Sequence, residues 1–132
     1  MTVIDASALL VALAVPGGPG RAARRRLSGA ALTAPALIDL EVAAALRRLV
    51  AGGRMARPDA ESVLADCAVL PIERVSHERL VPRCWELRDN LTVYDASYVA
   101  LAELLGTTLV TADGRLARAP GLRCPVDLLG AS

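Results

Sequence analysis

The chain has 132 residues, of which 54% are hydrophobic, and its formal net charge is +1. This length predicts a single domain, residues 1–132, with a hydrophobic core of its own. The balanced charge excludes a general basic field for nucleic acid, although local arginine clusters remain open. One Trp, two Tyr and no Phe exclude base stacking as a major way of binding. All fifteen basic residues are arginine.

The three cysteines, Cys67, Cys84 and Cys124, are widely spaced and form no C-x-x-C motif. This pattern predicts reduced, mostly buried thiols rather than a disulfide framework or a zinc site. The N-terminus has no basic leader, and no segment reaches about 18 uninterrupted apolar residues. We therefore expect a cytoplasmic protein with no membrane partner.

The apolar periodicity of the N-terminal half predicts two short strands and three helices. In chain order they are a strand over 2–4, a helix over 8–15, a short basic helix over 21–27, a strand over 31–34 and a helix over 37–51. Residues 16–20, rich in Pro and Gly, are expected to separate the first two helices. Pro35 suits the first turn of the third helix, which is expected to stop at Gly52-Gly53.

The C-terminal half continues the alternation of helices and strands. Its expected elements are a helix over 58–69, an edge strand over 71–75, helices over 77–89 and 94–105, a strand over 107–111, a helical turn over 115–119 and an edge strand over 122–126. Short strands alternating with helices, without a hairpin signal, predict a three-layer α/β/α domain with a mainly parallel sheet of about five strands.

Residues 91–116 predict a helix, a turn, a strand and a loop in succession. The helix over 94–105 is almost entirely apolar, and Gly106 fits the position just past its end. The following strand ends shortly before Asp113. Acids at the start of a helix and just past the carboxyl end of a parallel strand lie where open sheets place their sites. Asp95 and Asp113 are therefore expected to share one crevice.

Glu41 interrupts an apolar stripe in the helix over 37–51. The stripe consists of residues that recur at helical spacing: Ile38, Val42, Ala45 and Leu49. Because burial of an unpaired carboxylate is costly, Glu41 needs a shifted pKa, an arginine partner or a metal ion. Asp39 points elsewhere and is expected to be a solvated or helix-start charge.

Asp5 directly follows the first predicted strand. Three acids (Asp5, Asp95 and Asp113) thus lie at the ends of predicted elements, and a fourth, Glu41, interrupts an apolar stripe. Each alone has an ordinary explanation: a helix cap for Asp5 or Asp95, a turn for Asp113, or an arginine-paired carboxylate for Glu41. If they converge, their mutual repulsion favours a bound cation, and Mg²⁺ or Mn²⁺ suits carboxylate oxygens better than zinc does. Such a site is suited to metal-assisted hydrolysis of phosphodiesters.

Four segments of the chain resemble the PIN-domain family, and in particular the VapC-type ribonuclease toxins of bacterial toxin–antitoxin pairs. They are residues 3–7, 35–43, 94–102 and 110–116. The resemblance implies a Mg²⁺- or Mn²⁺-dependent endoribonuclease that acts on RNA, forms a homodimer and is held inactive by a cognate VapB-type antitoxin.

The resemblance also implies roles for individual residues. Asp5 and Asp95 would be direct metal ligands, Glu41 a ligand or a base that positions water, and Asp113 a ligand directly or through water. Ser7 and Thr111 stand where members of the family often have a supporting hydroxyl.

Arginine must supply the phosphate contacts, because the chain contains no lysine. Arg115 is the foremost candidate, and its alternative is a solvated or aspartate-paired side chain. Residues 24–26, three consecutive arginines, are expected to form a solvated helix face. His77 is expected to be an incidental surface or capping residue.

The absence of lysine argues against receiver domains, haloacid-dehalogenase-like phosphotransferases and Walker-type nucleotide sites. The remaining rival is a catalytically inactive PIN-fold module that binds an antitoxin or RNA, and retention of all four acids argues against it. Apolar residues over 9–15 and on a second stripe of the helix over 37–51 predict a homodimer surface and an antitoxin groove.

Overall fold

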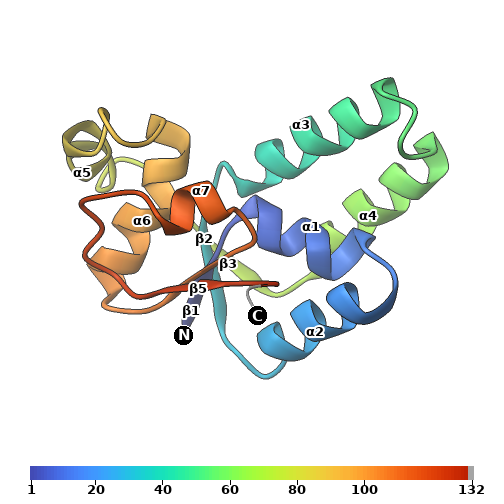
Figure 1. Cartoon of the computed structure of the whole chain (residues 1–132), viewed down its shortest axis with the longest axis horizontal. Helices are drawn as coiled ribbons and strands as arrows, with labels where there is room; N and C mark the ends of the chain where they lie inside the picture. The colour runs from blue at the N-terminus through green and yellow to red at the C-terminus, as the bar shows by residue number, and fades with distance from the viewer. Residues whose placement is uncertain (131–132) are drawn as a thin grey trace.

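The computed structural model describes residues 1–130 and contains one five-stranded sheet (Figure 1). The strands lie in the order β3-β2-β1-β4-β5, and every neighbouring pair is parallel. Their bounds are β1 (Thr2–Ile4), β2 (Leu32–Pro35), β3 (Ile72–Val75), β4 (Leu109–Thr111) and β5 (Val126–Leu128). The prediction of a parallel sheet of about five strands is confirmed, and so is the placement of the third and last strands at its edges.

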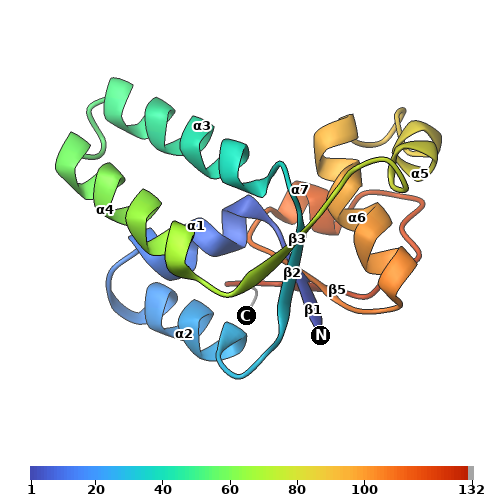
Figure 2. The same ribbon diagram turned by 180° about the vertical axis from the view of Figure 1, so that it is seen from behind.

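Helices cover both faces of the sheet, as Figures 1 and 2 show. On one side lie α1 (Ala6–Ala14), α2 (Gly17–Leu27), α3 (Ile38–Ala51) and α4 (Arg57–Val69). On the other side lie α5 (Val81–Glu86) and α6 (Val93–Leu105), and α7 (Gly114–Ala117) follows β4. The three-layer α/β/α class is confirmed. Within residues 1–130, no helix is both long enough and apolar enough to cross a membrane.

The core centres on α6 and the three inner strands of the sheet. All residues from Ala96 to Ala102 are buried, and α6 contacts β1, β2 and β4. Small residues on this helix let it approach the sheet closely, while Tyr98 and Leu101 fill the remaining volume. The helix ends at Gly106, which adopts the left-handed conformation with φ of 63° that favours glycine.

The strand order reverses between β1 and β4. The chain runs outward from β1 to β2 and β3, and then returns to the other side of β1 with β4. Ile4 pairs with Val110, so the carboxyl ends of these two central strands meet at the same edge. Ligand sites of open parallel sheets lie at such a switch point, outside the carboxyl ends of the strands. Asp5 and Asp113 follow β1 and β4 at this edge.

The roles of one proline and of one glycine-rich segment differ from the sequence prediction. Pro35 ends β2 instead of opening α3. The Ala36 N–H donates to the Val75 carbonyl of β3, so the proline nitrogen faces the other side of the strand. On that side, β1 has already stopped pairing at Thr33. The expected break between the first two helices is present but is confined to Val15 and Pro16, and Gly17 to Gly20 form the first turn of α2. A Cβ on Gly20 would lie 1.8 Å from the Val15 carbonyl oxygen, so only glycine permits this tight junction.

Two other elements differ from the sequence prediction in extent. The helix expected over 77–89 is reduced to α5, with turns on both sides. The last strand begins at Val126, whereas residues 122–126 were expected to form it. β4 reaches back only to the Pro125 carbonyl, which accepts the Leu109 N–H, and side chains hold the backbone before it. Arg83 donates to the Gly121 carbonyl at 2.7 Å, and the Arg123 N–H donates to Glu103 at 2.8 Å.

Glu103 is the centre of this clamp between α6, α5 and the C-terminal loop. It accepts two hydrogen bonds from Arg83, at 2.7 and 3.2 Å, and the two side chains are only 16% and 13% exposed. Burial alone would raise the pKa of Glu103, but the hydrogen bonds from Arg83 and Arg123 and their charges hold it below its usual value.

Glu103→Gln is expected to lower the free energy of unfolding at neutral pH by about 1–3 kcal/mol, because it removes the charge on a hydrogen-bonded pair. A carboxyl group whose pKa is depressed by folding stabilises the fold above its unfolded pKa and loses this contribution as the pH falls through the folded value. In urea titrations the wild type should therefore lose stability below the ordinary glutamate pKa of 4.5, and the variant should lose less there. Glu61→Gln, which alters an exposed pair with Arg57 at 3.5 Å, is the control. Equal changes in both variants would contradict the assignment.

Candidate active site

Asp5 is the most deeply buried acid of the four, with 5% of its surface exposed. It caps α1 by accepting the Ala8 N–H at 2.9 Å. Ser7 donates to the same oxygen at 2.7 Å, and the Thr111 hydroxyl donates to the other. Burial raises the pKa of Asp5, the three hydrogen bonds oppose this rise, and the nearby charge of Asp95 adds to it. Asp5 can therefore cap α1 and at the same time belong to a site shared with the other acids.

Ser7 and Thr111 connect the first acid to the last one. The Ser7 oxygen accepts the Ala112 N–H at 2.9 Å, and the Thr111 oxygen accepts the Asp113 N–H at 3.0 Å. Asp113 caps α7, accepting the Arg115 N–H at 2.9 Å. These hydroxyls thus fix the loop after β4 against the start of α1, as a supporting role requires.

Glu41 lies in the first turn of α3, half-buried, and its partner is a residue that the sequence prediction missed. The Tyr98 hydroxyl donates to Glu41 Oε1 at 2.6 Å, from a side chain that is only 1% exposed. Burial raises the pKa of Glu41, the Tyr98 hydrogen bond lowers it, and the charges of Asp95 and Asp5 raise it further. The sequence analysis expected Glu41 to have a shifted pKa, an arginine partner or a metal ion. In the structure, its hydrogen-bond partner is a tyrosine hydroxyl.

Asp95 lies in the first turn of α6, where its N–H is capped by the Thr92 hydroxyl at 3.1 Å. Its Oδ2 accepts a hydrogen bond from Arg115 Nη2 at 3.1 Å. The same nitrogen lies 3.2 Å from Asp113 Oδ2. Arg115 is therefore paired with aspartate, which was the alternative to a side chain free to bind phosphate. It joins Asp95 to Asp113, the two acids that were expected to share a crevice.

All four acids line one cavity of about 180 Å³ at the switch point. The cavity is also lined by Ser7, Tyr98 and Arg48. Arg48 is a second residue that the sequence prediction missed, and its charge lowers the pKa of Glu41. Both missed residues lie on helical faces already marked by an acid, Tyr98 one turn after Asp95 and Arg48 two turns after Glu41, and that spacing is the signal that could have found them.

The donor set is chemically suited to a hard divalent cation, since carboxylate and hydroxyl oxygens are the ligands that Mg²⁺ and Mn²⁺ prefer. In the described part of the chain, however, no three His, Cys, Asp or Glu side chains are grouped so that they could hold a metal ion as they stand. The acids converge on one cavity but require side-chain rearrangement to share an ion.

The remaining predicted residues lie away from the cavity. Arg24 donates to the Ala12 carbonyl at 2.9 Å and Arg26 pairs with Asp127, so the three arginines form an exposed, partly paired helix face. His77 Nε2 accepts the Leu37 N–H at 3.0 Å just before α3, as a capping residue would.

Asp39 points away from the acids, as expected, but it is not simply solvated. It accepts two hydrogen bonds from Arg74, each at 2.9 Å, and the Arg74 guanidinium lowers the pKa of Asp39. The cysteines are free, two of them buried and Cys124 half-buried.

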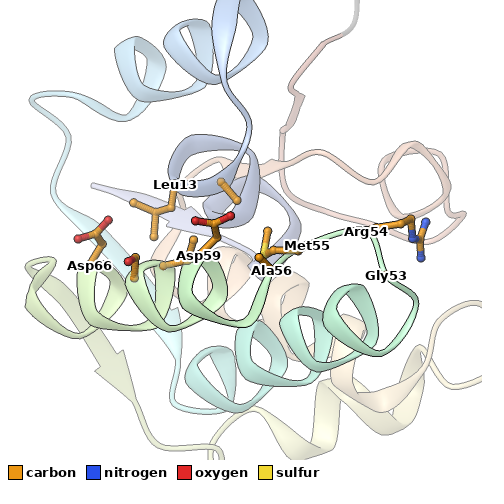
Figure 3. Close-up of a pocket in the computed structure, with 10 residues that line it drawn as sticks. Leu13, Gly53, Arg54, Met55, Ala56, Asp59 and Asp66 are labelled. Atoms are coloured by element: carbon orange, nitrogen blue, oxygen red, sulfur yellow. The ribbon is translucent and has the colours of Figure 1, made fainter.

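Several larger cavities contain none of the four acids, and two of them bear on possible partners. One, of about 700 Å³, lies between the end of α1 and the α3–α4 hairpin. Figure 3 shows Asp59 and Asp66 on the side of α4 that faces Leu13. The other, of about 460 Å³, is mostly apolar and is lined by Leu37, Leu40, His77, Leu80, Val81, Cys84, Trp85, Val93, Tyr94 and Ser97. We refer to these ten residues as the α3–α5–α6 surface.

A parallel sheet flanked by helices, with four carboxylates around one cavity at its switch point, defines an α/β domain with an acidic site. Comparison with known proteins identifies the family. The PIN domain matches residues 2–122. VapC ribonuclease Mb0985 of Mycobacterium bovis is 42% identical over 129 residues, 98% of each chain. The chain therefore belongs to the PIN-domain family and, within it, groups with the VapC ribonucleases.

Solved structures agree with this assignment. PAE2754 from Pyrobaculum aerophilum superposes with a TM-score of 0.72 at 27% identity, covering 96% of this chain and 83% of that one. VapC20 of Mycobacterium tuberculosis, described as a sarcin-ricin-loop-cleaving toxin, gives a TM-score of 0.66 at 14% identity, over 88% and 92% of the two chains. The second likeness is one of fold alone. The family resemblance inferred from the sequence is confirmed.

Proposed function

We propose that this protein is a Mg²⁺- or Mn²⁺-dependent endoribonuclease, the toxin of a toxin–antitoxin pair, that hydrolyses RNA phosphodiester bonds. The observation that carries the proposal is the convergence of Asp5, Glu41, Asp95 and Asp113 on one cavity at the switch point. The 42% identity to a protein named VapC ribonuclease supports the choice of RNA as substrate. Residues 1–132 would act as one unit.

In this proposal Asp5, Asp95 and Asp113 hold the metal ion, and Glu41 either joins them or orients water. A divalent ion at such a site acidifies water and offsets charge on the leaving oxygen. Tyr98 engages Glu41 Oε1, which leaves Oε2 to accept a hydrogen bond from the attacking water. Ser7 and Thr111 keep the Asp5 carboxylate oriented toward the cavity.

The arginines at the cavity supply the charge that an RNA backbone requires. Arg48 lines the cavity on the Glu41 side, and Arg115 borders Asp95 and Asp113. Two guanidinium groups on opposite sides of the acids could hold the phosphates that flank the cleaved bond, because arginine binds phosphate oxygens in bidentate fashion.

The test is cleavage of total bacterial RNA by purified, antitoxin-free protein in Mn²⁺, Mg²⁺ or EDTA, with fragment ends mapped. Discrete fragments that require the metal and disappear in EDTA are expected. Absence of cleavage by folded protein in both metals would favour the inactive module that binds an antitoxin or RNA.

We also propose a homodimer built on the α3–α5–α6 surface. Leu40, Trp85 and Tyr94 are 75%, 62% and 61% exposed there, and buried aromatic residues contribute strongly to protein interfaces. The surface is continuous with the starts of α3 and α6, which carry Glu41 and Asp95. Residues 9–15, which were also expected to offer a partner surface, are less exposed, because Leu9 and Ala12 are buried and their neighbours are half-covered by α2, α3 and α4.

Trp85→Glu is expected to weaken dimerisation by about thirtyfold or more, since it places a charge in the centre of the proposed interface. Light scattering should give twice the chain mass of 13.8 kDa for the wild type and the single mass for the variant. Val69→Glu changes an 81%-exposed residue at the end of α4 and should leave the dimer intact. A monomeric wild type at tens of micromolar would refute the dimer.

The proposed protein partner is a cognate VapB-type antitoxin. The cavity between α1 and α4 is a suitable seat, since Leu13, Met55 and Val63 offer apolar contacts while Asp59 and Asp66 favour a basic segment. We place the protein in the cytoplasm, where RNA is available and three free thiols remain reduced.

A further inference from the structure

Arg115 makes an unusual contact for an arginine beside a proposed metal site. Its Nη2 atom lies 3.1 Å from Asp95 Oδ2 and 3.2 Å from Asp113 Oδ2, so one nitrogen bridges carboxylates from two different elements. The side chain is nevertheless 67% exposed. Among the described residues, its guanidinium pairs with these two acids alone, and both acids line the cavity.

The backbone of Arg115 is anchored independently of this bridge. Its N–H donates to Asp113 Oδ1 at 2.9 Å as part of the cap of α7. The side chain can therefore leave Asp95 and Asp113 Oδ2 by rotation about its own bonds without disturbing the helix or the loop after β4.

The bridge and a metal ion on the same oxygens would oppose each other. Mg²⁺ requires ligand oxygens at about 2.0–2.1 Å, and a guanidinium bound to those oxygens would bring two positive charges into close contact. The described residues also hold no acid trio that is ready for a metal ion as it stands. Binding of a metal ion to Asp95 Oδ2 and Asp113 Oδ2 therefore favours release of Arg115.

We propose that Arg115 is an exchangeable counter-ion: it pairs with Asp95 and Asp113 in the metal-free protein, is displaced when the metal binds, and is thereby freed to bind the RNA phosphate. This inference rests on the proposed metal site. Release exposes a planar fork of donors that matches phosphate oxygens. The same side chain then opposes metal binding and promotes RNA binding.

A fixed structural bridge would behave in the opposite way. If Arg115 served only to hold Asp95 and Asp113 together, its removal would let the carboxylates repel each other and would weaken metal binding. Exchange predicts tighter metal binding after removal, because no ion pair has to be broken first. The sign of the change in metal affinity thus separates the two roles.

The experiment is calorimetric titration of Mn²⁺ into the full-length protein without RNA, for the wild type, Arg115→Gln and Arg118→Gln. Arg118→Gln removes the same charge just after α7 without touching either acid, so it corrects for long-range electrostatics. Arg115→Gln is expected to tighten Mn²⁺ binding by about three- to tenfold, as the loss of two exposed ion pairs allows. Arg118→Gln should remain within about twofold of the wild type, because its exposed side chain has no ion pair with either acid to break and its charge is screened.

A second experiment measures cleavage and binding of RNA. At saturating Mn²⁺, Arg115→Gln should raise KM for RNA and reduce the salt dependence of binding by about one phosphate contact. Wild-type Mn²⁺ binding without tightening in Arg115→Gln would overturn the exchange but leave the metal site standing. No Mn²⁺ binding by the folded wild type would overturn both.

Discussion

Asp95→Asn is expected to reduce RNA cleavage by about a thousandfold, since the metal contributes several kcal/mol to transition-state stabilisation and an amide cannot replace the charge that holds it. The fold should survive. The amide has the shape of the carboxylate, and the backbone contact of residue 95 with Thr92 does not involve its side chain. Growth arrest on expression should be lost together with cleavage, whereas antitoxin binding should remain.

The matched control is Asp89→Asn, an exposed acid that lies between α5 and α6 and outside the cavity. It removes the same charge and should cleave at the wild-type rate. Cleavage rates, thermal unfolding and co-purification with the antitoxin would be measured for both variants. Wild-type cleavage by Asp95→Asn would show that the proposed acids are not the active site.

Tyr98→Phe is expected to slow cleavage by about ten- to a hundredfold, the usual cost of removing a group that orients a metal-site ligand. Tyr98 is a positioning residue, because it contacts Glu41 and not the RNA. Its hydrogen bond lowers the pKa of Glu41 against the effect of burial. Without the hydroxyl that pKa rises, so Glu41 is protonated at a higher pH and activity is lost first on the acidic side.

The pH profile distinguishes this role from simple support of the core. The loss of rate should be larger at acidic pH than at alkaline pH, because more of Glu41 is protonated there in the variant. Tyr94→Phe, one turn earlier on α6 and 61% exposed, keeps an aromatic ring and should not change the profile. A uniform loss of rate at all pH values in Tyr98→Phe would contradict the positioning role.

The sequence predicted the positions of the acids well because each is tied to the end of an element. Asp5 caps α1 directly after β1, Asp113 caps α7 after β4, and Asp95 lies in the first turn of α6. Residues of these types at such boundaries have local causes, and the alternation of strands and helices brings the boundaries to one edge of a parallel sheet. Local chemistry and topology were sufficient for these three residues.

The partners of the acids could not be predicted, because they depend on how distant elements dock. Tyr98 meets Glu41 across 57 residues, from a helix on the opposite side of the sheet. Arg115 joins Asp95 to Asp113 only after α6 and α7 lie side by side. Periodicity marks which face of a helix is buried but does not state which polar group that face will meet.

The location of the exposed apolar surface also depends on how distant elements dock. Periodicity indicated residues 9–15, but α1 is covered by three other helices, and the exposed apolar residues gather instead around α5. The shift of the last strand likewise follows from the tertiary contacts of Arg83 and Glu103 with the loop before it.

Anomalous diffraction from crystals soaked in Mn²⁺ tests most directly whether the carboxylates at the switch point share a divalent metal. We expect an anomalous peak in the cavity, in contact with Asp5 and Asp95, with the Arg115 side chain turned away. Soaked crystals with no peak at these acids, or with Mn²⁺ bound only elsewhere, would contradict this expectation.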